Sequence, residues 1–170
     1  HKLVAYSDAA VIPYPTQEQR ISQTRYLATL CHGMGIDCPR ISLIHCSEHI
    51  DERHFPHTGG YADIIERGRQ GEFGPCIIDG PLDLKTSMCP ESLAVKGIDS
   101  PVGGDADALV FPDIEAANVF HKTITLLASA RIAAVLQGPD VPVVMPSRGD
   151  DADSKYYSLA LAALQSLKNA

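Results

Sequence analysis

The chain has 170 residues, of which 45% are hydrophobic and 21% are charged; these values are ordinary for a soluble globular domain with its own core. Its formal net charge is −7, which argues against nucleic acid or an anionic membrane as partner. The sequence has no run of about 18 apolar residues, so no transmembrane helix is predicted, and no signal peptide is visible. The five cysteines show no C-x-x-C spacing, so we predict reduced thiols in a cytoplasmic protein.

Strand-like apolar runs alternate with segments of helical periodicity along the chain. In chain order, we predict a strand at 2–12, a helix at 16–36, a strand at 39–46, a helix at 59–71, a strand at 75–82, a helix from Pro90 within 83–97, a strand at 106–113, a helix at 114–137, a strand at 141–146 and a helix at 151–168. This alternation predicts an α/β fold in which one sheet is flanked by helices on both faces.

Two local signals add to this prediction. Thr16 and Gln19 stand at capping-box spacing where the first helix begins. Each of the five predicted strands ends in polar or Gly/Pro-rich sequence, and parallel strands carry their chemistry at their carboxyl ends. The five strand ends are therefore predicted to form one cleft.

The sharpest motif follows the last predicted strand, in VPVVMPSRGDD at residues 141–151. A helix N-terminus offers N–H groups and a positive dipole end to a phosphate or an oxyanion. Ser147 can hydrogen-bond a thiol or a phosphate oxygen, and Arg148 provides a planar fork of donors for an anion. An acid in the next turn can take a proton from a nucleophile. On spacing alone we favour the plainer interpretation, in which Asp150 or Asp151 caps the helix.

A second motif, GGDADALVFPDIEAANVFHK, occupies residues 103–122. Its two glycines suit a tight turn, and Asp113 stands at a strand-to-helix junction. Asn118 and Lys122 are four residues apart and so share a helix face. They either contact a ligand or belong to a capped helix with a solvated polar stripe, and the motif alone favours the second alternative.

Two further motifs have plain and functional interpretations. HCSEHIDERHFPH at 45–57 resembles a set of metal ligands, but it has neither H-E-x-x-H nor structural-zinc spacing, so we predict no metal. A polar loop that responds to pH is the preferred interpretation. In CIIDGPLDLKTS at 76–87, the predicted strand ends in a D-G-P turn that would expose Asp79, although an ordinary turn explains it equally well.

Three of these segments together resemble the phosphate acetyl/butyryltransferase family. IIDGPLDL, GGDADALVFPDIEAANVFHKT and VPVVMPSRGDDADSKYYSLALA occur in the order and spacing of that family. DGPL, PDIEA-x-N and Ser-Arg-x-Asp are closest to the butyryltransferase forms, and the opening SDAAVIPYPTQEQR also fits. The resemblance covers essentially the whole chain.

The resemblance implies reversible transfer of an acyl group between coenzyme A and phosphate, with acyl-CoA and inorganic phosphate as substrates and no cofactor. It implies the isocitrate/isopropylmalate dehydrogenase-like fold, with two α/β domains, a cleft between them and a homodimer. On that layout, residues 1–135 are the second domain. The strand and helix of 136–170 complete the first domain, whose N-terminal portion is absent from this sequence.

By residue match, the resemblance implies that Ser147 orients the CoA thiol and that Arg148 stabilises the charge that develops during transfer. The base stays open between two acids. Asp150 fits the butyryl-type pattern, and Asp153 lies one position short of the acetyl-type site, which is Ser154 here. The residues expected to bind substrate are Asp79, Asp113, Asn118 and Lys122.

Two other functions stay open at this point. One is a non-catalytic fragment that binds CoA or a nucleotide. The other is a metal- and NAD-dependent dehydrogenase of the same broad fold, for which the cluster at 45–57 would supply ligands. The sequence also leaves open the acyl chain length, the oligomeric state and whether this chain is active alone.

Overall fold

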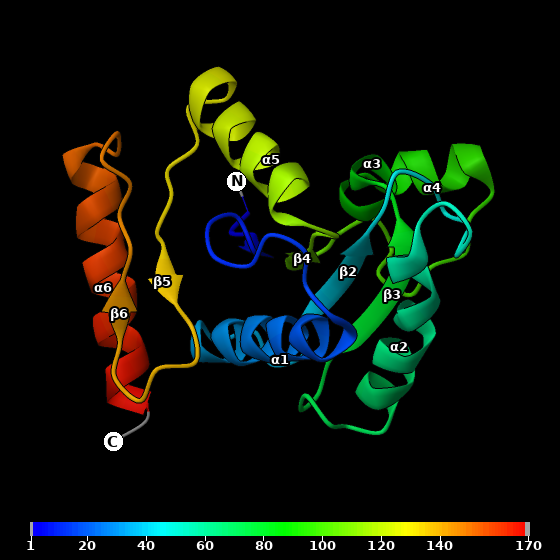
Figure 1. The fold of residues 1–170 in the computed structure, drawn as a ribbon, viewed down its shortest axis with the longest axis horizontal. Coiled ribbons are helices and arrows are strands. Elements are labelled where there is room, and N and C mark those ends of the chain that lie inside the picture. Colours follow the sequence, from blue (N-terminus) through cyan, green and yellow to red (C-terminus); the bar gives the residue numbers. More distant parts are fainter. Residues whose placement is uncertain (1, 169–170) are drawn as a thin grey trace. The chain divides into compact units, whose positions relative to one another are not determined.

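The computed structural model describes residues 2–168, and the chain divides into two compact units between Asn118 and Val119. The elements of the first unit, in chain order, are β1 (Ala5–Ser7), α1 (Gln17–Gly33), β2 (Arg40–Ile44), the 3-10 helix η1 (Pro56–Gly60), α2 (Tyr61–Arg69), β3 (Ile77–Leu82), α3 (Leu84–Met88), α4 (Pro90–Lys96), β4 (Ala108–Val110) and the first residues of α5 (Ile114–Leu127). The four strands form one parallel sheet in the order β1-β4-β2-β3 (Figure 1).

Helices cover both faces of this sheet, as predicted. Ile41 and Leu43 of β2 are fully buried on one face, in a core cluster that they share with side chains of α1 and α2, among them Leu27, Ala28, Tyr61 and Ile64. Because neighbouring residues of a strand point to opposite faces, Ser42 points to the other face. There its hydroxyl is 2.6 Å from that of Ser87 in α3. The predicted α/β class with flanking helices is therefore confirmed.

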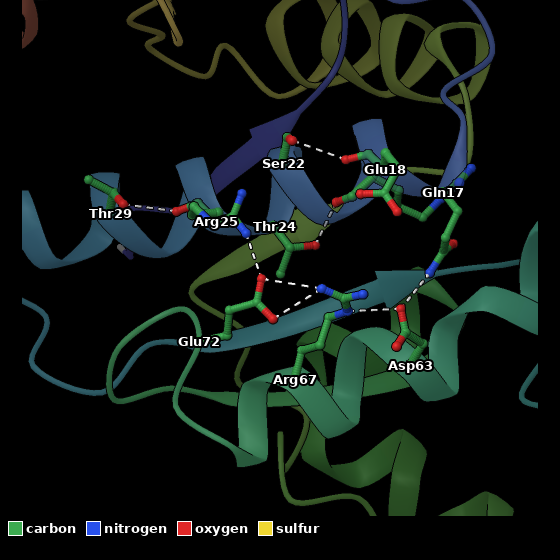
Figure 2. Close-up of polar contacts among 10 residues, drawn as sticks. Gln17, Glu18, Ser22, Thr24, Arg25, Thr29, Asp63, Arg67 and Glu72 are labelled. Atoms are coloured by element: carbon green, nitrogen blue, oxygen red, sulfur yellow. Dashed lines mark hydrogen bonds and ion pairs between the residues drawn. The ribbon is translucent and has the colours of Figure 1, made fainter.

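Polar contacts join α1 to α2 and to the loop after α2 (Figure 2). The carboxylate of Glu72 accepts from Arg25 of α1 at 2.6 Å and from Arg67 of α2 at 3.2 Å. Arg67 also donates to Asp63 at 3.0 Å, and Gln17 of α1 donates to Asp63 at 3.4 Å. These pairs are exposed or half-buried, so they orient the two helices but contribute little free energy each.

The capping box predicted for the first helix is present. The Thr16 hydroxyl accepts from the backbone N–H of Gln19 at 3.3 Å, and the Gln19 side chain accepts from the backbone N–H of Thr16 at 2.8 Å. The predicted helix at 59–71 is α2. Residues 83–97 contain one more helix than predicted, because Asp83 accepts from the backbone N–H of Thr86 at 2.6 Å and caps α3.

The D-G-P turn predicted after residue 78 is wrong, because β3 continues through Asp79, Gly80 and Pro81 to Leu82. Pairing with β2 changes register between Ser42 and Ile44, and the backbone at Gly80 comes very close to Leu43. A Cβ at Gly80 would lie 2.6 Å from the Leu43 carbonyl oxygen, so glycine permits this close approach.

The second unit contains the rest of α5, then β5 (Val135–Leu136), β6 (Val143–Val144) and α6 (Ala152–Lys168). The predicted strand at 141–146 does not join the parallel sheet. It pairs antiparallel with β5, a strand within the predicted helix at 114–137. That helix ends at Leu127. Strand β5 is favoured because its backbone pairs with β6, and the adjacent N–H of Ala134 donates to Ser158 of α6 at 2.9 Å.

Candidate functional site

The carboxyl ends of the four parallel strands lie along one edge of the sheet. The residues at or just after these ends are Ser7, Asp8, His45, Asp83 and Asp113. The prediction of one cleft from five strand ends needs correction, because β6 belongs to the separate two-stranded sheet. Four of the five ends therefore share an edge.

Asp8 organises the loop after β1. Its two carboxylate oxygens accept from the backbone N–H groups of Ala10, Val11 and Ile12 at 2.9, 3.1 and 2.7 Å. Asn118 of α5 donates to the carbonyl oxygen of Ala9 in the same loop at 3.0 Å. The loop is thus held in one shape by side chains at both of its sides, and Asn118 contributes to that shape.

Asp113 joins β4 to α5. Its carboxylate accepts from the backbone N–H of Ala116 at 2.8 Å, which is the hydrogen bond of a helix cap. The contacts of Asp113 are therefore those of a capped helix, which is the plainer of the two interpretations of this motif. Capping fixes where α5 begins and hence where Asn118 meets the loop after β1.

A buried arginine, Arg20, and a neutral, half-buried histidine, His57, lie near this edge. Arg20 of α1 is only 3% exposed, and it donates to the carbonyl oxygens of Pro112 at 2.9 Å and Pro15 at 3.3 Å. Its Nε and the Nε2 of His57 are buried, and within residues 2–168 neither has a hydrogen-bond partner. Burial, with the charges of Arg20 and His45, lowers the pKa of His57 to about 4, so the ring is neutral at pH 7.

Glu48, in the loop after β2, belongs to a charged network that includes Lys96 and Asp83. Lys96 donates to Glu48 and to Asp83, both at 2.7 Å, and the Thr86 hydroxyl donates to Glu48 at 3.2 Å. Burial opposes ionisation of Asp83, yet hydrogen bonds from Lys96 and Thr86 lower its pKa to about 2. The loop after β2 is thereby tied to α3 and α4.

The histidine-rich segment 45–57 forms ring contacts and a local ion pair. The ring of His45 lies 4.6 Å from that of Phe55 and 5.3 Å from that of His57, measured between centroids, and His54 pairs with Asp51 at 2.8 Å. In the part of the chain that the structure describes, no group of three or more His, Cys, Asp or Glu is placed to hold a metal ion.

In the second unit, Ser147 and Arg148 lie in an exposed turn between β6 and α6. The Asp150 carboxylate accepts from the backbone N–H of Ser147 at 2.7 Å, which closes the turn. Asp151 accepts from the backbone N–H of Ser154 at 2.8 Å and caps α6. The prediction that one of these two acids is a helix cap is confirmed for Asp151, and the Ser-Arg pair is left facing solvent.

The remaining predicted residues occupy different positions. Asp153 is exposed in the first turn of α6, Lys122 is exposed on α5, and Asp79 is half-buried within β3 opposite Ser42. Sequence reasoning missed Asp8 and Arg20. The signal for Asp8 was an Asp directly before a run of small residues at a strand end, a pattern typical of side-chain-to-backbone turns.

The family model described as "Phosphate acetyl/butaryl transferase" matches residues 1–163. A phosphate acetyltransferase from Thermotoga maritima is 36% identical over 158 residues, which cover 93% of this chain and 53% of that protein. A phosphate butyryltransferase from Clostridium beijerinckii is 34% identical, with 99% of this chain and 55% of that protein covered. A crystal structure of a branched-chain phosphotransacylase from Enterococcus faecalis matches with a TM-score of 0.84 at 28% identity, covering 95% of this chain and 59% of the other.

The chain thus spans about half the length of these curated relatives. Among the helices that the structure describes, none has both the length and the apolar character needed to cross a membrane. The family model covers nearly the whole chain, including the edge of the parallel sheet and the Ser147 turn, so the chain belongs to the phosphate acetyl/butyryltransferase family.

Proposed function

We propose that this chain is the carboxyl-terminal part of an enzyme that transfers a short-chain acyl group between coenzyme A and phosphate. The observation that carries the proposal is the exposed Ser147–Arg148 turn, which lies inside the family match. Its substrates would be acyl-CoA and inorganic phosphate. Both substrates are anionic while the chain carries a net charge of −7, so local cations such as Arg148 and Lys122 must attract them.

In the proposed reaction a phosphate oxygen attacks the thioester carbonyl carbon. The carbon–sulfur bond then breaks, and the CoA thiolate leaves and takes up a proton. Arg148 presents a planar set of donors to the oxyanion that forms at the carbonyl. The Ser147 hydroxyl donates to the sulfur. Asp150 holds the backbone of this turn at Ser147, and a fixed turn keeps both side chains in place, which is the kind of positioning that lowers a barrier by several kcal/mol.

For the reverse direction the CoA thiol needs a base. One oxygen of Asp150 already accepts from the backbone of Ser147, whereas Asp153 is exposed one turn further on. We therefore assign the base to Asp153 and a positioning role to Asp150. Such a base contributes roughly 10²–10⁴-fold to a rate.

The four predicted substrate-binding residues divide by their contacts. Lys122 is exposed and is the one we assign to an anionic substrate group. Asp113 and Asn118 bond to nearby backbone, so their proposed effect on substrate binding passes through the loop after β1. Asp79 lies in β3, and its proposed role is a contact with substrate from the sheet.

The domain layout is a further part of this proposal. We assign residues 1–135 to the second domain of the isocitrate/isopropylmalate dehydrogenase-like fold and 136–170 to completion of the first. Strand β6 and helix α6 lie together in one compact unit, which begins at Val119, and this supports placing these two elements in one domain. A homodimer and a cytoplasmic location remain predictions, which sedimentation and cell fractionation would test.

The test is phosphate-dependent release of free CoA thiol from acetyl-, propionyl- and butyryl-CoA. We expect release that requires phosphate and falls strongly in both Ser147→Ala and Arg148→Ala. Ser166→Ala, in the last turns of α6, is the matched control and should keep the activity. The best acyl-CoA would identify the branch of the family. Binding of acyl-CoA without any release would instead favour the non-catalytic CoA-binding alternative.

A further inference from the structure

The amino-terminal ends of β2 and β3 carry two thiols that the proposed acyl transfer does not use. Cys38 and Cys76 both line one shallow pocket, together with Arg69, Pro75 and the backbone of three glycines at 68, 71 and 74. The pocket lies at the start of the two strands, whereas the candidate site lies at their carboxyl ends. Whatever these thiols do is therefore separate from the carboxyl-end edge of the parallel sheet.

The sheet brings the two cysteines close together. Arg40 pairs with Ile77, and the backbone N–H of Ile77 donates to the carbonyl oxygen of Pro39 at 2.9 Å. Cys38 lies two residues before β2 and Cys76 lies one residue before β3, so both thiols stand at the same end of two neighbouring strands. Both side chains also line the same pocket.

The environments of the two thiols differ in a way that suits a two-step exchange. Cys38 is exposed, so a reagent reaches it directly, whereas Cys76 is half-buried. Burial raises the pKa of Cys76, and the charge of Cys38 raises it further. Arg69 is exposed beside them and supplies a positive charge for an anionic reagent.

We propose that Cys38 and Cys76 form a reversible redox couple, oxidised to an intramolecular disulfide by a low-molecular-weight disulfide. The Cys38 thiolate attacks one sulfur of the reagent, whose S–S bond breaks and whose first thiolate leaves and is protonated. The Cys76 thiol then loses its proton and attacks the Cys38 sulfur, which releases the second reagent thiol. The protein loses two electrons and two protons, and the reagent gains them as two thiols.

The pair differs from the other cysteines of the chain. Cys31 is fully buried in the core, and burial raises its pKa to about 11, with a smaller contribution from Asp107. Cys46 is exposed beside His45, and Cys89 donates to Glu91 at 3.1 Å. None of these three lines the pocket. Cys38 and Cys76 are therefore the two cysteines that share this pocket.

The experiment treats the reduced, purified protein with oxidised glutathione and maps its peptides without reduction. We expect loss of two thiols per chain and a joined Cys38–Cys76 peptide that dithiothreitol separates. In Cys76→Ser the first step cannot be resolved, so glutathione should stay attached to Cys38. In Cys38→Ser the joined peptide should be absent, and the exposed-cysteine control Cys46→Ser should form it as the unchanged protein does.

Three results would overturn the proposal. They are a stable glutathione adduct on Cys38 in the unchanged protein, a joined peptide that contains Cys46 or Cys89 in place of either partner, and no loss of thiols at all. Because Cys38 is exposed, Cys38→Ser should fold normally, and a matching thermal unfolding curve would confirm that its result concerns the thiol. None of these outcomes depends on whether the protein transfers acyl groups.

Discussion

His57 lies in a place where protonation is costly. Burial is the largest cause of its low pKa, about 4, and the nearby charges of Arg20 and His45 add to it. An unfolded histidine has a pKa of about 6.5. Between these two values the unfolded chain binds more protons than the folded chain, so the free energy of unfolding should fall as the pH drops from about 6.5 to about 4.

This pH dependence is checked by urea unfolding at pH 7 and pH 5. We expect the unchanged protein to lose stability at the lower pH and His57→Gln to lose distinctly less. His49→Gln, at an exposed histidine of the same loop, should behave as the unchanged protein does. Equal losses in His57→Gln and in the unchanged protein would contradict the account.

Asp150 and Asp153 should separate by how much activity each substitution removes. In the direction that consumes CoA, Asp153→Asn removes the proposed base, and we expect a loss of roughly 10²–10⁴-fold. Asp150→Asn loosens the Ser147 turn, so we expect a smaller loss. The reverse pattern would assign the base to Asp150.

Glycines in the segment before β4 provide a prediction at the scale of an element. Gly103 and Gly104 both have φ near +69°, a conformation that costs other residues roughly 1–2 kcal/mol. A Cβ at Gly104 would also lie 2.5 Å from the backbone nitrogen of Pro90, at the start of α4, whereas a Cβ at Gly103 would meet only Arg40 at 3.4 Å. Alanine at either position would have an unfavourable φ, but only alanine at Gly104 would also come too close to the backbone of α4.

We therefore expect Gly104→Ala to destabilise the protein more than Gly103→Ala, by a further ~1–3 kcal/mol from overpacking against α4. Chemical denaturation of the two variants side by side measures this difference. Equal destabilisation would mean that α4 moves aside without cost.

The elements that sequence reasoning found are those with a local cause. Helix α1 begins at a capping box, and the four parallel strands are apolar runs bounded by turn residues. Strand β5 was missed because its segment, ASARIAAVLQ, consists mainly of residues that favour helices. What makes Val135 and Leu136 a strand is β6, whose Val143 and Val144 come later in the chain. The strand pattern of 141–146 was recognised, but the residues of the β5 segment alone do not show that β6 will pair with it.

The candidate site divides in the same way. The Ser147–Arg148 pair was recognisable because its residue types suit anion chemistry and stand at a helix start. The motif alone favoured a capped helix, and substrate contacts for Asp113 and Asn118 came only from the family resemblance. In the structure their side chains bond to the backbone of Ala116 and Ala9. Arg20 could not be found, because nothing in a helical pattern says which polar residue will be buried by the carbonyls of distant loops.

At the scale of the whole molecule, the two units differ in the amount of buried strand. The central strands β2 and β4 consist almost entirely of buried residues, while β5 and β6 contribute two half-buried residues each. Local opening needs little free energy where few apolar contacts are lost. We expect amide hydrogens of Ile41–Leu43 and Leu109–Val110 to exchange more slowly than those of Val135–Leu136 and Val143–Val144.

Hydrogen exchange followed by mass spectrometry tests this expectation, with separate peptides for the two sheets. A difference of at least one order of magnitude in exchange rate would correspond to about 1.4 kcal/mol in the free energy of opening. Uniform exchange would mean that both units open together in one cooperative step.

The sheet order has a consequence for the emergence of this chain from the ribosome. Strand β4 lies between β1 and β2, and Ala5 of β1 is paired with Ala108 of β4. During synthesis β1 and one side of β2 therefore have no neighbour until more than a hundred residues have been translated. Unpaired strand edges of this kind attract other chains. A chain whose synthesis ends before Phe111 would expose these unpaired strand edges. We expect such a product to bind chaperones.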